Sequence, residues 1–176
     1  MRSIKFLALT GIAVAFFAVA ATAQKKPVKK TPVKKSSEPT RVLPALDVRV
    51  GREKVEIQLA NVNRFVDVLG PIAQGIEMLD ESAKTKPLPP ATADKNGANK
   101  QKVVVAIRNL KAGISDLETE FRTKPLLQKY LPTIEGITGL GARSEDSALA
   151  GKFVAAKEPL RNVARKLTDT LAALPR

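Results

Sequence analysis

Two groups of carboxylates have a spacing that acid–base chemistry could use. Asp116 and Glu120 are four residues apart and share a face if their segment is helical, while Glu77, Asp80 and Glu81 form a second cluster. The chain has no histidine and no cysteine, which removes the commonest general base, the usual zinc and haem ligands and all thiolate chemistry. Because helix surfaces routinely carry such acids, we interpret both groups as solvated polar faces. We therefore expect no enzyme activity, no metal and no cofactor.

The tetrapeptide Asp94–Gly97 is similar to the start of a calcium-binding loop. That loop needs glycine at its sixth position and glutamate at its twelfth. Here glycine is fourth and Val105 is twelfth, so the spacing excludes the motif. We interpret the tetrapeptide as a turn.

The most distinctive candidate site is a group of six lysines within eleven residues near the N-terminus: Lys25, Lys26, Lys29, Lys30, Lys34 and Lys35. Lysines near a charged membrane surface each contribute about 1 kcal/mol to binding, so the group predicts contact with a polyanion. Anionic lipid or an acidic envelope polymer is the expected partner. Nucleic acid is less favoured, because no aromatic residue is interleaved for base stacking. The alternative is a spacer whose lysines only maintain solubility and extension.

Positive charge is concentrated in this part of the chain. The net charge is +13, and residues 24–41 carry seven positive side chains against one negative. Residues 42–176 carry 21 positive and 16 negative side chains, so the longer segment is only mildly basic. The uneven distribution predicts that a basic tail and a nearly balanced domain have separate roles.

The first 23 residues have the organisation of a secretory signal peptide. Arg2 and Lys5 form a positive start, residues 6–20 are apolar, and Ala21-Thr22-Ala23 offers small residues for cleavage before Gln24. We expect export to a bacterial periplasm or secretion. An uncleaved membrane anchor is the alternative, since lysines follow at once and positive charge tends to stay in the cytoplasm.

Residues 24–44 predict a disordered linker. The tetrapeptide PVKK occurs twice, at Pro27–Lys30 and Pro32–Lys35. Proline removes backbone donors, and the lysines repel one another, so this segment cannot bury enough apolar surface to offset its ordering entropy. An extended tether follows from this composition.

Residues 45–176 predict an all-α domain. Apolar residues recur every three or four positions, which is typical of amphipathic helices. The stripes contain Val55, Leu59, Val62, Val66, Leu69, Ala73 and Ile76; then Val103, Ile107, Leu110, Ile114, Leu117 and Phe121; and finally Leu149, Phe153, Ala156, Leu160, Val163, Leu167 and Leu174. We expect an antiparallel up-down bundle of three long, proline-kinked helices, or four if Pro125 makes a true turn.

The expected helix boundaries rest on capping and breaking residues. The segment Lys84–Lys100 predicts the main loop because it contains three prolines, and Asn99 is the expected cap of the helix after it. Thr123 is expected to cap a new helix near Pro125, and Ser144 to start the last helix. Pro71 and Pro159 predict kinks inside helices. Residues 46–59 also alternate as two short strands would, so a β-hairpin is an alternative there.

These features favour a non-enzymatic interaction or scaffold protein of the cell envelope. Its tail would contact a polyanionic surface, and its bundle would present a helical face to a protein partner or to a second copy. Strict heptad stripes pair between chains as well as within one, so a coiled-coil homodimer is an open alternative. A second functional hypothesis is a carrier that holds an apolar ligand or lipid inside a kinked bundle.

Overall fold

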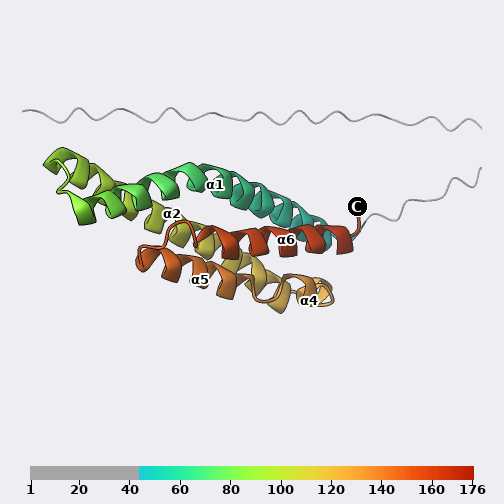
Figure 1. The fold of residues 1–176 in the computed structure, drawn as a ribbon. Helices are drawn as coiled ribbons and strands as arrows, with labels where there is room; N and C mark the ends of the chain where they lie inside the picture. The colour runs from blue at the N-terminus through green and yellow to red at the C-terminus, as the bar shows by residue number, and fades with distance from the viewer. Residues whose placement is uncertain (1–43) are drawn as a thin grey trace, which may run out of the picture. The chain divides into compact units, whose positions relative to one another are not determined.

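The computed structural model describes residues 44–176, and its elements in that range are all helices (Figure 1). The predicted signal peptide and the predicted linker up to residue 43 lie outside the described residues. The helices are α1 (Leu46–Thr85), α2 (Pro90–Thr123), α3 (Pro125–Gln128), α4 (Leu131–Ile134), α5 (Ile137–Leu149) and α6 (Lys157–Ala173). The predicted all-α class is confirmed. The hairpin alternative for residues 46–59 is wrong, because this segment belongs to α1.

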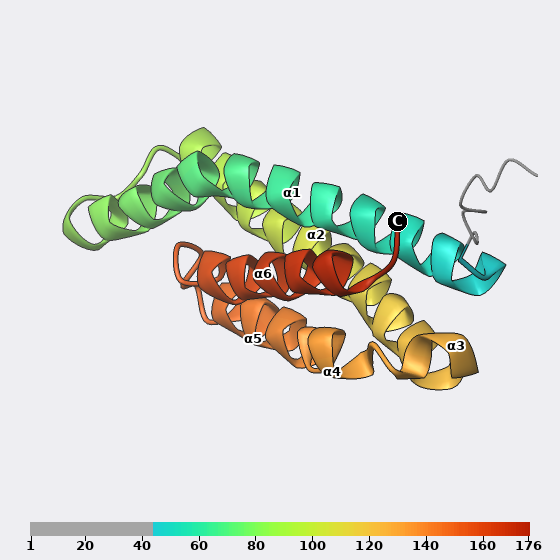
Figure 2. The ribbon, with the colours of Figure 1, turned by 90° about the vertical axis from the view of Figure 1, so that its right-hand side faces the viewer.

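The long helices α1, α2, α5 and α6 form a four-membered ring. Each of them packs against its two neighbours in the ring: α1 on α2, α2 on α5, α5 on α6, and α6 on α1 (Figure 2). Contacts between opposite ends show that each pair is antiparallel, as Lys54 meets Glu120 and Asp80 meets Asn96 between α1 and α2. The bundle is therefore an up-down-up-down arrangement, with α3 and α4 connecting α2 to α5.

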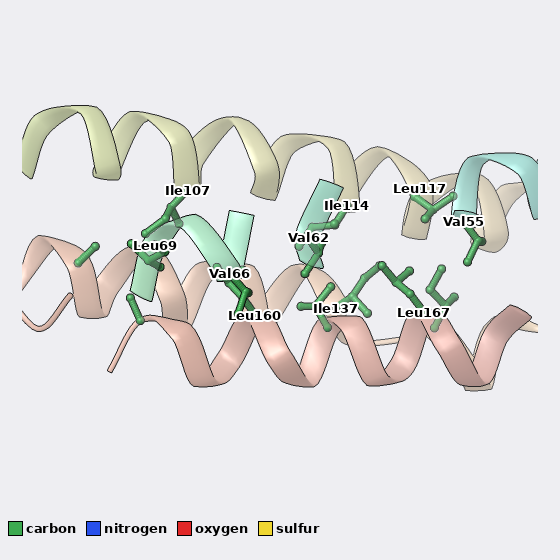
Figure 3. Close-up of a cluster of buried hydrophobic side chains, with 14 of the residues drawn as sticks. Val55, Val62, Val66, Leu69, Ile107, Ile114, Leu117, Ile137, Leu160 and Leu167 are labelled. Atoms are coloured by element: carbon green, nitrogen blue, oxygen red, sulfur yellow. The ribbon is translucent and has the colours of Figure 1, made fainter. Parts of the chain in front are cut away.

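The interior is built from the predicted apolar stripes. In the first two stripes every residue is buried except Leu59 and Leu110, which are partly buried. Figure 3 shows Val62 from α1, Ile114 from α2 and Ile137 from α5 within one cluster of side chains. The helices approach closely where a glycine removes a side chain: a Cβ atom on Gly141 of α5 would lie 2.8 Å from Cδ1 of Ile114. These contacts explain why three- and four-residue spacing located the core.

The prediction for the last helix is wrong in two respects: the helix does not begin at Ser144, and two helices take the place of one. Ser144 lies inside α5, fully buried, and its hydroxyl donates to the Ala156 carbonyl oxygen across 2.8 Å. The chain then breaks at Gly151, which has a left-handed φ of 75° that glycine adopts without steric cost. The break shifts the phase of the apolar stripe, so Leu149 is 60 % exposed although the stripe placed it in the core. Pro159 lies in the first turn of α6 rather than at an internal kink.

The predicted loop between the first two helices lies where expected but is much shorter than predicted. Only residues 86–89 separate α1 from α2, and Pro90 occupies the first helical position, where its missing N–H group leaves no hydrogen bond unmade. The predicted turn at Asp94–Gly97 and the predicted cap at Asn99 therefore both lie inside α2. Within this segment, Asn96 contacts Asp80 of α1, and this contact offsets the weak helix propensity of asparagine.

Pro125 makes a true turn, which decides between three and four helices. α2 ends at Thr123, and Pro125 is the first residue of α3. The residue at the cap position is Lys124 rather than the predicted Thr123, whose hydroxyl instead donates to the Thr119 carbonyl oxygen at 2.9 Å. Together with the break at Gly151, this turn gives four long helices, α1, α2, α5 and α6, instead of three.

Pro71 does not interrupt its helix. α1 continues through Gly70 and Pro71 to Thr85, so Pro71 lies inside a helix as predicted, and the helix curves along its length (Figure 1). A proline within a helix cannot donate to the carbonyl four residues earlier, and such a site favours a bend.

One buried polar residue gives a direct stability prediction. Asn96 is 4 % exposed; its amide nitrogen donates to the Asp80 carboxylate at 2.9 Å, but its Oδ1 has no partner. A buried polar atom without a partner costs about 1–3 kcal/mol, and Asp80 would keep Lys100 at 2.6 Å. We expect Asn96→Leu to raise the free energy of unfolding by about 1 kcal/mol in urea denaturation. The control Asn63→Leu, at an exposed position, should change the free energy of unfolding little. A loss of stability in Asn96→Leu would contradict the view that the buried Oδ1 atom of Asn96 is destabilising.

Candidate functional site

The predicted polyanion-binding lysines, Lys25 to Lys35, lie outside the described residues. The structure does place every carboxylate considered for chemistry, and it assigns most of them to contacts between or within helices.

The acids near the end of α1 do not form a shared site. Glu77 accepts a hydrogen bond from the Val154 backbone N–H at 2.8 Å, which ties α1 to the connection before α6. Asp80 accepts from Asn96 and is paired with Lys100, both on α2, while Glu81 is paired with Lys84 on its own helix. Among residues 44–176 no group of His, Cys, Asp and Glu side chains is arranged to hold a metal ion. The interpretation as a merely solvated face misses the contacts of Glu77 and Asp80 with other elements.

The second pair of carboxylates, Asp116 and Glu120, also does not form a shared site. Glu120 lies 2.7 Å from the Lys54 amine and 2.8 Å from the Lys124 amine. Burial raises the pKa of Glu120, but hydrogen bonds and charge from these two lysines lower it more, so its pKa lies below the ordinary glutamate range. Asp116 is exposed and lines a hollow of about 390 Å³ beside Lys54. Glu120 is therefore held as an ionised salt-bridge partner, a form that does not supply a proton.

Glu118 is a buried carboxylate that accepts hydrogen bonds from the backbone at the start of another helix. It is 7 % exposed, and its two oxygens accept backbone hydrogen bonds from Gly136 and Thr138, each at 2.9 Å. These N–H groups belong to the first turn of α5, where helix donors have no partner within the helix. Burial raises the Glu118 pKa, but the two backbone N–H groups and the Arg122 charge lower it further, so the net pKa is below its ordinary value. Glu118 thus fixes the start of α5 onto α2.

A second carboxylate, Glu145 on α5, also binds this helix to α2. It accepts hydrogen bonds from Lys111 and from Arg108, the latter at 2.8 Å. These two donors lower the Glu145 pKa despite its burial. The sequence pattern predicts this role for neither Glu118 nor Glu145. The available signal was weak: Glu118 directly follows a buried stripe residue, Leu117.

An apolar hollow lies between α2 and the end of α5 with the connection that follows it. It has a volume of about 640 Å³ and opens to solvent. Its apolar lining includes Val104, Val105, Ala148, Leu149 and Phe153, with Lys100 and Arg108 at the rim. The hypothesis of an apolar-ligand carrier placed the ligand between kinked helices inside the bundle. There the stripe residues pack against one another, so a surface hollow would have to take that role.

None of the helices within residues 44–176 has a stretch long and apolar enough to cross a membrane. Comparison with known proteins identifies no relative: the chain matches no protein-family model, no curated protein and no solved structure.

Proposed function

We propose that this protein is an exported, non-enzymatic interaction protein of the cell envelope, in which the lysine tail holds a polyanionic surface and the helical bundle is the part displayed there. The observation that carries the proposal is the charge segregation. Seven of the positive side chains fall within residues 24–41 with a single acid, whereas residues 42–176 combine 21 positive with 16 negative side chains. Clustered lysines give a favourable, salt-sensitive attraction to anionic surfaces.

The bundle's own contacts support this division of roles. Glu118, Glu120 and Glu145 are each held by backbone N–H groups or by cationic side chains of the bundle. Much of the domain's charge is therefore used internally, to fix one helix against another. The tail lysines provide a concentrated charge that a flat anionic surface could meet as a group.

A matched pair of variants tests the tail. In Gln24–Arg176, Lys25, Lys26, Lys29 and Lys30 are changed to glutamine in one protein. Exposed Lys86, Lys95, Lys129 and Lys152 of the bundle are changed in the other. Both variants lose the same charge, and at about 1 kcal/mol per lysine we expect the tail variant to bind vesicles with anionic lipid at least ten-fold more weakly. The bundle variant should bind nearly as the unmodified protein does. Equal losses in both variants would reject the tail as the anchor.

A further inference from the structure

The α1–α2 pair has one face that no other described helix covers. α5 and α6 lie on the opposite side of this pair, as Figures 1 and 2 both show. Three large apolar side chains that line this face are strongly exposed: Ile57 (52 %), Val68 (53 %) and Val105 (51 %), with Val105 at the edge that it shares with the hollow beside α5. Scattered exposed apolar residues need no explanation, but a set that shares one face of two adjacent helices marks an interaction surface.

The same face is hollowed along its length. Three hollows of about 390, 460 and 410 Å³ follow one another along this face, the first two between α1 and α2 and the third on α2 alone. The first and second share Gln58 and Gly113, and the second and third share Ala106 and Asn109, so together they form one groove. A long groove with an apolar lining matches the shape of a helix.

The α2 wall of this groove carries a second heptad stripe, separate from the buried one. Its members are Ala98, Lys102, Val105, Asn109, Ala112 and Asp116, spaced alternately by four and three residues, and all are exposed. Small residues at Ala106, Ala112 and Gly113 would let another helix approach closely. The repeat therefore suits a long helix lying along α2.

The charges of this stripe identify its partner and orientation. Lys102 and Asp116 each lie seven residues from Asn109, on opposite sides of it. Neither forms an ion pair with another residue of the described range. A second α2 placed antiparallel about Asn109 brings each Lys102 within one turn of the other copy's Asp116, and Val105 opposite Gly113. A parallel arrangement would place like charges together, which is unfavourable.

From this self-complementarity we infer that the α1–α2 groove is a homodimer interface, in which two copies pair antiparallel across a twofold axis near Asn109. The interface is isologous, because the same surface serves both copies. It requires nothing from the lysine tail, so it stands apart from the proposed envelope function. It also leaves the α5–α6 side of each copy accessible.

A charge exchange within the stripe tests the dimer. Protein expressed from the full 176-residue chain is compared with Lys102→Glu, with Asp116→Lys and with the double variant, by sedimentation velocity at low salt. Each single change replaces two attractive pairs by two repulsive ones, so we expect the dimer dissociation constant to rise roughly ten-fold or more. The double variant restores opposite charges and should dimerise like the unmodified chain. An equimolar mixture of the two single variants should form heterodimers, because all four charges are then complementary.

A second pair of variants separates the interface from general surface effects. Val105→Asp should abolish dimerisation, whereas Val154→Asp, at another exposed valine outside the groove, should not. Circular dichroism of all variants shows whether the fold is retained. The inference is overturned if the unmodified chain is monomeric up to about 100 µM, well above the dissociation constants of ordinary stable dimers. It is equally overturned if a dimer forms that neither the charge exchange nor Val105→Asp affects.

Discussion

Replacing Glu118 with glutamine is expected to lower the free energy of unfolding by about 2 kcal/mol at pH 7. The carboxylate accepts from two backbone N–H groups at the start of α5, and hydrogen bonds to a charged acceptor are the strong class. Glutamine can accept only one of them and presents an NH₂ group to the other. Urea denaturation followed by circular dichroism would show the transition about 1 M lower, with an unchanged slope.

The control and the pH dependence make this prediction specific. Glu135→Gln removes a carboxylate 3.7 Å from the same Arg122, but an exposed one, and should cost less than about 0.5 kcal/mol. Because the folded pKa of Glu118 is depressed, its contribution is complete above the pKa of the unfolded chain and is lost as pH falls through the folded pKa. The stability gap between the unmodified chain and Glu118→Gln should therefore narrow below pH 4.5. A gap that widens towards acid would contradict the assigned role.

Leu160→Ala is expected to destabilise the bundle by about 3 kcal/mol, while the same substitution at Leu149 should cost less than about 0.5 kcal/mol. Both leucines belong to one apolar stripe in the sequence. In the structure Leu160 is fully buried in α6, whereas Leu149 is 60 % exposed at the end of α5. Truncation of a buried leucine loses its transfer free energy and leaves a cavity, and neither cost arises at an exposed site.

This comparison is matched because the chemical change is identical at the two positions. Equilibrium urea denaturation of the two variants beside the unmodified chain supplies the measurement. Similar losses at both positions would mean that the stripe continues without a break, and that the phase change at Gly151 does not occur. A small loss at both would mean that α6 does not contribute to the common core.

The sequence predicts the core well because burial imposes a regular spacing on long helices. In α1 and α2 the stripes from Val55 to Ile76 and from Val103 to Phe121 identify almost every interior position. The spacing works there because the helices are 40 and 34 residues long and contribute one continuous face each. The helical class follows from the same pattern.

Helix ends are harder to predict because proline and glycine occur in loops as well as at the ends and inside of helices. Prolines at 87, 89 and 90 indicate a loop, yet Pro90 begins a helix that absorbs Asp94, Gly97 and Asn99. Gly151 ends a stripe by adopting a positive φ, which no pattern of apolar residues reveals. Glu118 illustrates a further limit: its role depends on backbone groups 18 and 20 residues away, and these are brought near it only by the turn at Pro125.

The prediction of a polyanion-binding site in the tail depends on amino-acid composition and not on the positions of side chains in space. The lysines from Lys25 to Lys35 are identified by their density alone, and that hypothesis stays a prediction because those residues lie outside the described range. The self-complementary stripe on α2 was not found in the sequence, although all its residues are visible there. Its significance depends on knowing which face of α2 is covered by α5 and which remains open.

A comparison of Gln24–Arg176 with Val42–Arg176 tests whether the tail is an electrostatic anchor for the bundle. Each is titrated with salt while its binding to anionic vesicles, to a soluble acidic polysaccharide and to DNA is measured. We predict that the longer protein binds an anionic surface with an affinity that falls steeply as salt rises, and that the shorter one does not bind. Binding of both forms with the same affinity and the same salt dependence would contradict the claim and reduce the tail to a spacer.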